Sequence, residues 1–119
     1  MGKYQELLVT WEETYKKGQL TLWIFLSLRE GQKHVNEMKE FIKELSQGTI
    51  VCDEQSLYRA LRKFYDVSLV DFSFVKGNRG PDKKYYFLTD LGKRLLAEFI
   101  ERNILLFFNE RLIKLINIK

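Results

Sequence analysis

The sequence predicts one mainly α-helical domain that carries a small β-hairpin. Three observations lead to this fold class. Five segments repeat apolar residues at helical spacing, with charged residues between them. Two short runs rich in aromatic and β-branched residues flank a stretch dense in turn-forming residues. Finally, a chain of 119 residues that is 45% hydrophobic and 30% charged has the length and composition of one packed domain.

The first three predicted helices span 3–16, about 20–30 and 33–47. The first is amphipathic and ends near Gly18, a residue type common at helix C-termini. The second is apolar over most of its circumference, which predicts that it is the central helix of the core. The third has one apolar stripe and an opposite face of alternating charges. His34, near its start, is expected to be a surface or capping residue.

A fourth helix is predicted over 54–66, with Asp53 as its N-cap. The short β-branched run at 49–51 before it is a candidate for a stub of strand. The buried stripe of the fourth helix consists of Leu57, Leu61 and Phe64. Its polar and basic residues lie largely off that stripe and are expected to face outward.

Two strands follow, over 69–75 and 84–88, joined by a basic turn that contains the only proline of the chain. They predict a hairpin with a long, basic tip. Within the second strand, alternation is expected to bury Tyr85 and Phe87 together and to leave Tyr86 on the other face, so packing is favoured over base stacking for these rings.

The last predicted helix begins after Thr89 or Asp90 and runs to about 117, because no proline interrupts it. Its apolar residues cover more than one face, which a small domain cannot bury by itself. A two-fold dimer would bury the remainder, with help from the helix at 3–16. The residues expected in this interface are Leu95, Phe99, Leu106, Phe107, Leu112, Ile113 and Ile116.

The basic charge is concentrated in one part of the chain. Residues 56–84 hold seven basic and three acidic side chains, whereas 1–55 hold seven basic and nine acidic ones, and the whole chain has a net charge of +4. A contiguous basic excess of this kind is a candidate footprint for a polyanion, although a solvated surface with ordinary scatter is the simpler alternative.

Two helices joined by a turn, a basic outward face on the second and a hairpin directly after it are typical of a winged helix-turn-helix. The helix at 54–66 would enter the major groove of double-stranded DNA and the wing at 76–84 would lie on the backbone or minor groove. We divide the chain into a DNA-binding domain at 1–88 and a dimerisation helix at 89–119. The predicted DNA-binding residues are Ser56, Tyr58, Arg59, Arg62, Lys63, Lys76, Asn78, Arg79, Lys83 and Lys84.

These residues also carry a family resemblance. Residues 56–64, with the motif Leu-Tyr-Arg-Ala-Leu, resemble the recognition helix of PadR-like winged-helix regulators, and 80–92, with Tyr-Phe-Leu-Thr, resemble their wing and the helix after it. The likeness covers about 18–100 and extends to small archaeal winged-helix regulators. The chain departs from the family at Ser68, where a glycine is usual. The resemblance implies a homodimeric, sequence-specific transcriptional regulator with a long C-terminal dimerisation helix.

Other functions have little support in the sequence. It offers no nucleophile–base pair, metal-ligand cluster or glycine-rich phosphate loop, so we expect neither an enzyme nor a metal or cofactor. No segment is apolar enough to span a membrane, and the single Cys52 suits the reducing cytoplasm. The alternatives are a winged-helix module that binds an acidic protein and a non-specific, chromatin-type DNA binder. A small-molecule effector remains an open partner.

Overall fold

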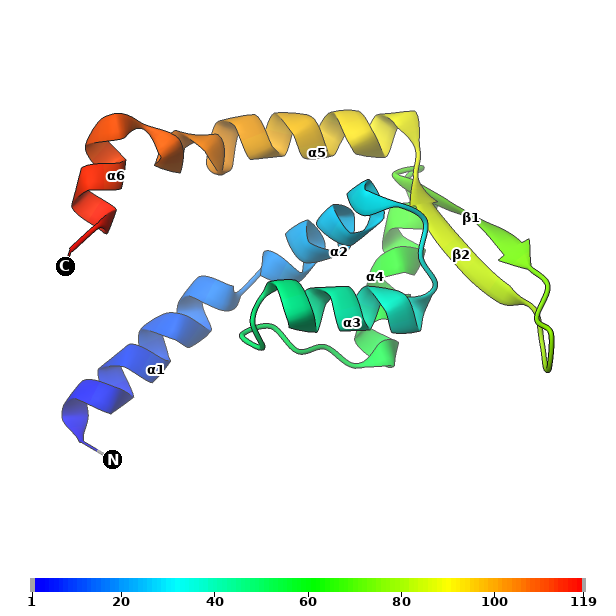
Figure 1. Cartoon of the computed structure of the whole chain (residues 1–119), viewed down its shortest axis with the longest axis horizontal. Coiled ribbons are helices and arrows are strands. Elements are labelled where there is room, and N and C mark those ends of the chain that lie inside the picture. Colours follow the sequence, from blue (N-terminus) through cyan, green and yellow to red (C-terminus); the bar gives the residue numbers. More distant parts are fainter. Residues whose placement is uncertain (1, 119) are drawn as a thin grey trace.

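The computed structural model describes residues 2–118, which form helices and a two-stranded antiparallel sheet that lies at one end of the molecule (Figure 1). The predicted fold class, mainly α with one hairpin, is confirmed. The elements are α1 (Lys3–Lys16), α2 (Gln19–Glu30), α3 (Val35–Leu45), α4 (Glu54–Asp66), β1 (Val70–Val75), β2 (Lys83–Leu88), α5 (Asp90–Asn103), the 3-10 helix η1 (Leu105–Phe108) and α6 (Glu110–Ile116).

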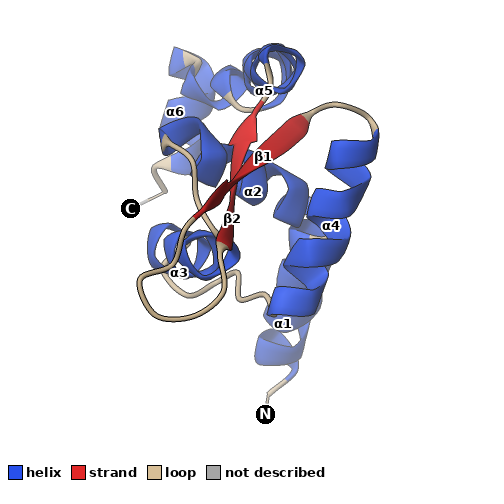
Figure 2. Cartoon of the chain, turned by 90° about the vertical axis from the view of Figure 1, so that its right-hand side faces the viewer, coloured by secondary structure: helices blue, strands red, loops and turns tan. Residues whose placement is uncertain are grey.

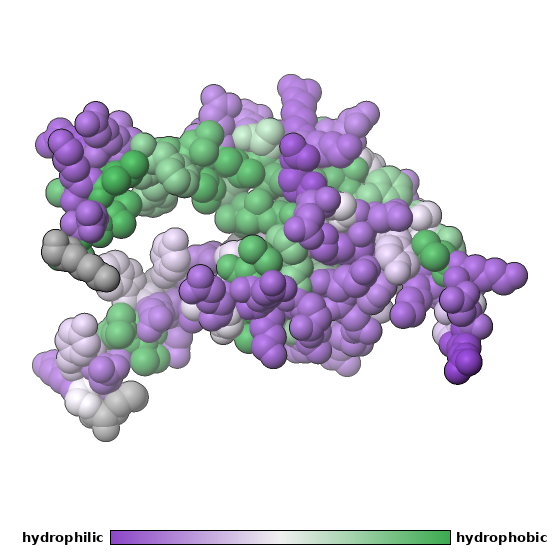
Figure 3. Space-filling model, viewed as in Figure 1, coloured by the Kyte–Doolittle hydropathy of each residue, from purple (hydrophilic) through white to green (hydrophobic). Residues whose placement is uncertain are grey.

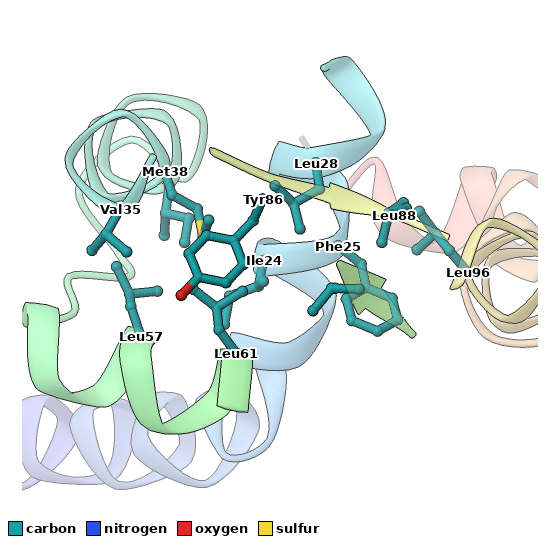
Figure 4. Close-up of a cluster of buried hydrophobic side chains, with 12 residues drawn as sticks. Ile24, Phe25, Leu28, Val35, Met38, Leu57, Leu61, Tyr86, Leu88 and Leu96 are labelled. Atoms are coloured by element: carbon teal, nitrogen blue, oxygen red, sulfur yellow. The ribbon is translucent and has the colours of Figure 1, made fainter. Parts of the chain in front are cut away.

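As predicted, α2 occupies the centre of the core (Figure 4). Ile24 is fully buried, and the ring of Phe25 packs edge-on against Phe64 of α4 with 5.0 Å between ring centroids. Every element from α2 to α5 contributes to this core, so α4 and the hairpin are held in fixed positions. The other buried apolar residues are Leu28, Val35, Met38, Ile42, Leu57, Leu61, Val70, Tyr86, Leu88 and Leu96.

Side-chain caps determine where the two helices of the helix-turn-helix, α3 and α4, begin. His34 Nδ1 accepts hydrogen bonds from the backbone amides of Asn36 and Glu37, and the Glu37 carboxylate accepts one from the His34 amide at 3.2 Å. This reciprocal pair is a capping box. At α4, Asp53 Oδ1 accepts a hydrogen bond from the Ser56 amide at 2.7 Å. Both predicted caps are confirmed.

The connection between α3 and α4 is a loop. The backbone reverses at Gln47 and Gly48, which have φ values of +53° and +77°. Ser46 Oγ then accepts a hydrogen bond from the Ile50 amide and donates one to the Ile50 carbonyl. The prediction of a short strand at 49–51 is therefore wrong. The backbone amide and carbonyl of Ile50, which a strand would use for pairing, are hydrogen-bonded to Ser46 instead.

The hairpin pairs in an unbroken register from Val70 opposite Leu88 to Val75 opposite Lys83. A further pairing comes from the segment between α2 and α3. The Lys33 amide donates to the Tyr86 carbonyl at 3.0 Å, and the Tyr86 amide donates to the Lys33 carbonyl at 2.8 Å. This bridge fastens the hairpin beside α3, and Figure 2 shows the two strands between α3 and α4.

The predicted orientation of β2 is wrong. Tyr86 is buried, with 6% of its surface exposed, whereas Phe87 is 36% exposed and Tyr85 is half-buried. Three consecutive aromatic residues give no signal for which face is apolar. Leu88 decides which face of β2 points into the core, because it is buried there. Residues two positions apart in a strand share a face, so Tyr86 is buried with Leu88.

The start of α5 is locked against the start of β1. Thr89 Oγ1 accepts from the Gly92 amide and donates to the Ser68 carbonyl at 2.6 Å, so Thr89 is the N-cap, as expected. Ser68 has a φ of +64°, a conformation that glycine adopts at lower cost. A Cβ at Gly92 would lie 2.1 Å from the Leu69 carbonyl oxygen. Only glycine permits this approach.

The single C-terminal helix predicted to run to about 117 is interrupted. Helix α5 ends at Asn103, whose side chain donates a hydrogen bond to the Phe99 carbonyl. Asn109 then caps α6 by accepting from the Arg111 and Leu112 amides. The two asparagines bracket five consecutive apolar residues that one straight helix could not direct to a single face, and η1 turns them.

Helix α1 confirms the prediction for 3–16 but contributes no buried residue. Trp11 is 73% exposed, Tyr15 68% and Leu7 62%. In Figure 3, apolar atoms gather along the side of α5, η1 and α6 that faces α1. The amphipathic pattern of α1 is therefore not satisfied by packing among residues 2–118.

Candidate nucleic-acid interface

Helix α4 presents a polar face because its apolar stripe packs against the core. Leu57 and Leu61 are fully buried, whereas Arg59 and Arg62 are exposed and Tyr58 is 50% exposed. The expectation that the basic residues face outward is confirmed.

The cap of α4 also uses part of its polar surface. The hydrogen bond from the Ser56 amide is the main cause that holds the pKa of Asp53 below its usual value. Ser56 itself is half-buried, so its hydroxyl is less accessible than the exposed side chains of Arg59 and Lys63.

A groove of about 740 Å³ lies between α4 and the hairpin. It brings together four of the predicted DNA-binding residues, Tyr58, Arg59, Arg62 and Lys84. They come from α4 and β2, and Lys84 lies 22 positions after Arg62 in the sequence. The remaining lining residues are Gln55, Leu61, Tyr65, Asp66, Phe72 and Tyr86.

Aromatic side chains form the hairpin side of this groove. The Phe72 ring packs against those of Tyr65 and Tyr86, with centroids 5.3 Å and 5.7 Å away. Lys84 Nζ lies 4.4 Å from the Phe72 centroid, a cation–π distance, so its charge is held at the groove. Burial is the main cause that raises the pKa of Tyr86, and the nearby Tyr58 raises it further. Its phenol therefore stays neutral and able to donate.

A second, smaller hollow of about 220 Å³ lies on the other flank of α4, against α2. Its polar lining consists of Thr21, Ser56, Arg59 and Lys63, with Ala60 and Phe64 beneath. Arg59 borders both hollows. We call the exposed surface of α4 between the two hollows the ridge of α4. Arg59, which borders both hollows, lies along its middle, or crest.

The four predicted residues of the wing tip lie outside both hollows. Lys76, Asn78, Arg79 and Lys83 are exposed at the far end of the hairpin, to the right in Figure 1. The turn is tight, because a Cβ at Gly77 would lie 2.8 Å from the Pro81 carbonyl oxygen. The tip thus holds its charges beyond the groove rather than in it.

Among the residues that the structure describes, no ion pair neutralises the basic groups of this surface. Among residues 2–118 the ion pairs are Lys33 with Glu30 and, if protonated, His34 with Glu37. Neither involves α4 or the wing. Acidic residues gather instead on α3, where Glu37, Glu40 and Glu44 line a separate hollow.

The lining residues that sequence reasoning did not select include Gln55, Tyr65 and Thr21. Gln55 and Tyr65 are exposed on α4, each one turn from a predicted contact, and helical spacing from Tyr58 and Arg62 would have found them. Thr21 could not have been found in this way, because it reaches the interface through the packing of α2 on α4.

The predicted dimer residues lie on α5, η1 and α6. Phe99 is 45% exposed, Phe107 47% and Ile116 59%, whereas Leu112 is half-buried. Leu95 and Phe99 also line a small apolar hollow of about 100 Å³ against α2. The remaining members, Leu106 and Ile113, are 44% and 46% exposed.

Residues 2–118 contain no group of three or more His, Cys, Asp or Glu residues placed to hold a metal ion. None of their helices has the length and apolar character needed to cross a membrane. Cys52 is half-buried, and burial raises the pKa of its thiol.

The chain is similar to known proteins in both sequence and fold. The model of the transcriptional regulator PadR-like family matches residues 24–98. No protein with a curated description matches the sequence. The structure of Bacillus subtilis PadR in complex with operator DNA is similar over 71% of this chain, with 25% identity and a TM-score of 0.64. The chain spans 46% of that protein's length.

Two further structures are similar in fold over most of their length. A PadR family transcriptional regulator from Eggerthella lenta has a TM-score of 0.69 and 22% identity, covering 98% of this chain and 97% of the other. A PadR-like transcriptional regulator from Bacillus cereus also has a TM-score of 0.69 and 22% identity, covering 89% and 99%.

Proposed function

Since this chain belongs to the PadR-like family of transcriptional regulators, we propose that it binds double-stranded DNA as a homodimer and regulates transcription. The observation that carries the proposal is the ridge of α4, which bears Arg59 at its crest and Arg62 and Lys63 on its flanks, none of them ion-paired among the described residues. The operator-bound state of the similar Bacillus subtilis protein supports it. The proposed place of action is the cytoplasm.

The proposed complex places α4 in the major groove. An α-helix with its side chains is about as wide as that groove, so its exposed ridge meets base edges. Arg59 and Arg62 are suited to guanine, because a guanidinium donates two parallel hydrogen bonds. The wing residues Lys76, Arg79 and Lys83 extend toward the sugar–phosphate backbone and supply charge.

The proposed dimer forms through the C-terminal region and α1. The apolar residues of α1, such as Trp11 and Tyr15, and those of α5, η1 and α6 remain exposed in one subunit. Together they form a larger apolar surface than soluble monomers usually expose. In this proposal residues 1–88 bind DNA and 89–119 provide most of the dimer contact. Two α4 helices about one duplex turn apart would then read a pseudo-palindrome.

Duplex binding should depend steeply on salt. If each dimer neutralises about six phosphates, the plot of log affinity against log salt concentration should have a slope near −5. Fluorescence anisotropy with random and selected duplexes, titrated from about 50 mM salt, measures this slope. Absence of binding to any duplex at the lowest salt would reject the proposed function and favour a protein-binding module. Equal affinity for random and selected duplexes would identify a non-specific DNA binder.

Charged substitutions in the C-terminal region should separate the subunits. We expect the wild type to have twice the 14.3 kDa mass of one chain in light scattering. Phe107→Glu combined with Ile113→Glu should give the mass of one chain, because burying two carboxylates in an apolar interface is unfavourable. The matched control is Phe74→Glu, an exposed aromatic residue of β1 at the other end of the molecule. A wild type of single-chain mass at micromolar concentration would contradict the dimer.

A further inference from the structure

The smaller hollow, between α2 and α4, has the lining that a phosphate site requires. Its polar side chains are hydroxyl groups and cations, and no carboxylate lines it. Thr21 and Lys63 are exposed, and among residues 2–118 Lys63 takes part in no ion pair. Because the hollow draws on two helices that are packed in the core, these groups keep a fixed relation to the ridge of α4.

The two flanks of α4 have different surroundings in the proposed complex. A helix lying in the major groove has one sugar–phosphate strand on each side, since the groove is bounded by both strands. The flank bearing Tyr58 and Arg62 faces the hairpin, where Lys84 supplies the opposite wall. The other flank bears Lys63, and its opposite wall is Thr21 of α2. Each flank therefore faces a different strand.

We propose that Thr21 and Lys63 bind a backbone phosphate of the DNA strand on the α2 side of α4, opposite the strand beside the wing. The inference rests on the proposed function and extends it. The Thr21 hydroxyl donates one hydrogen bond and the Lys63 ammonium supplies the charge. Ser56 borders the same hollow but is half-buried, whereas Thr21 is exposed, so we assign the hydrogen bond to Thr21. Arg59, at the crest, remains available for a base edge.

This site fixes the register of α4 in the groove. Phosphate contacts on both flanks position the helix along and across the groove but carry no sequence information. Loss of the α2-side contact should therefore weaken binding to cognate and random duplexes by the same factor. A contact of Lys63 to a base would instead change the preference between sequences.

The first test uses substitutions that keep the fold. Lys63→Gln should make the salt slope of the dimer shallower by about 1.8, which is about 0.9 for the phosphate in each half-site, whereas Lys43→Gln, an exposed lysine of α3, should not change it. Thr21→Val should weaken binding to all duplexes by roughly five-fold or more. Thr21→Ser, which keeps the hydroxyl, should stay close to the wild type.

The second test locates the phosphate. Duplexes with one neutral methylphosphonate at a time are titrated with the wild type and with Lys63→Gln. We expect one position in each half-site at which the methylphosphonate lowers the affinity of the wild type but does not lower the affinity of Lys63→Gln any further. The site would be overturned if Lys63→Gln lost affinity at every methylphosphonate position at which the wild type does. It would also be overturned if the salt slope of Lys63→Gln equalled that of Lys43→Gln. Either result would leave DNA binding itself intact. Failure of the wild type to bind any duplex would reject the underlying function instead.

Discussion

The double variant Arg59→Ala, Arg62→Ala should lose about 2–6 kcal/mol of binding free energy for each half-site of a duplex selected by the wild type, at roughly 1–3 kcal/mol for each good base contact. Both side chains are exposed on α4 and neither is ion-paired among the described residues. Alanine is a better helix former than arginine, so the helix itself should not be weakened. Fluorescence anisotropy gives the affinity, and circular dichroism verifies the fold.

The matched control is Arg29→Ala with Arg94→Ala, which removes the same charge from α2 and α5. Both of those arginines are exposed and lie outside the two hollows beside α4. If affinity followed net charge alone, the two double variants would weaken equally. Equal affinities in the folded proteins would therefore remove α4 from the role of groove helix.

Gly92→Ala should destabilise the protein by about 3 kcal/mol, which corresponds to a fall in Tm of roughly 10 °C or more. A Cβ at this position would lie 2.1 Å from the Leu69 carbonyl oxygen and 3.3 Å from Leu88. The backbone oxygen cannot rotate away as a side chain would, so the start of α5 must separate from β1. Thermal unfolding followed by circular dichroism measures the effect.

The sign of this effect is diagnostic, because replacing an ordinary glycine inside a helix by alanine stabilises it by roughly 0.5–1 kcal/mol. Gly31→Ala is the control. Nothing lies within 4 Å of a Cβ there, and its φ of 163° is extended backbone. A Gly92→Ala variant as stable as the control would mean that the close packing of α5 on β1 does not hold in solution.

The helices were predictable because each has a local signal. Asp53 caps α4 and His34 caps α3 through hydrogen bonds to residues two or three positions ahead, and such short-range chemistry is legible in the sequence. The apolar stripe of Leu57 and Leu61 likewise assigned the outward face of α4 correctly. These features need no knowledge of the rest of the chain.

The errors occurred where the local signal is ambiguous. The aromatic run at 85–87 is apolar on both faces, and the packing of Leu88 in the core chose Tyr86. The apolar run at 104–108 continued the helical pattern, but the structure turns there between Asn103 and Asn109. In both places a uniformly apolar stretch is compatible with more than one arrangement.

By itself the sequence determined the fold class, the order of the elements and the basic character of α4 and the wing, because periodicity, caps and charge are properties of neighbouring residues. Only the tertiary structure decided that Lys84 lies across a groove from Arg62, that Lys33 pairs with the hairpin, and that Thr21 stands beside Lys63. Such contacts depend on how separate elements pack, and packing follows from the shape of the whole core rather than from any local pattern.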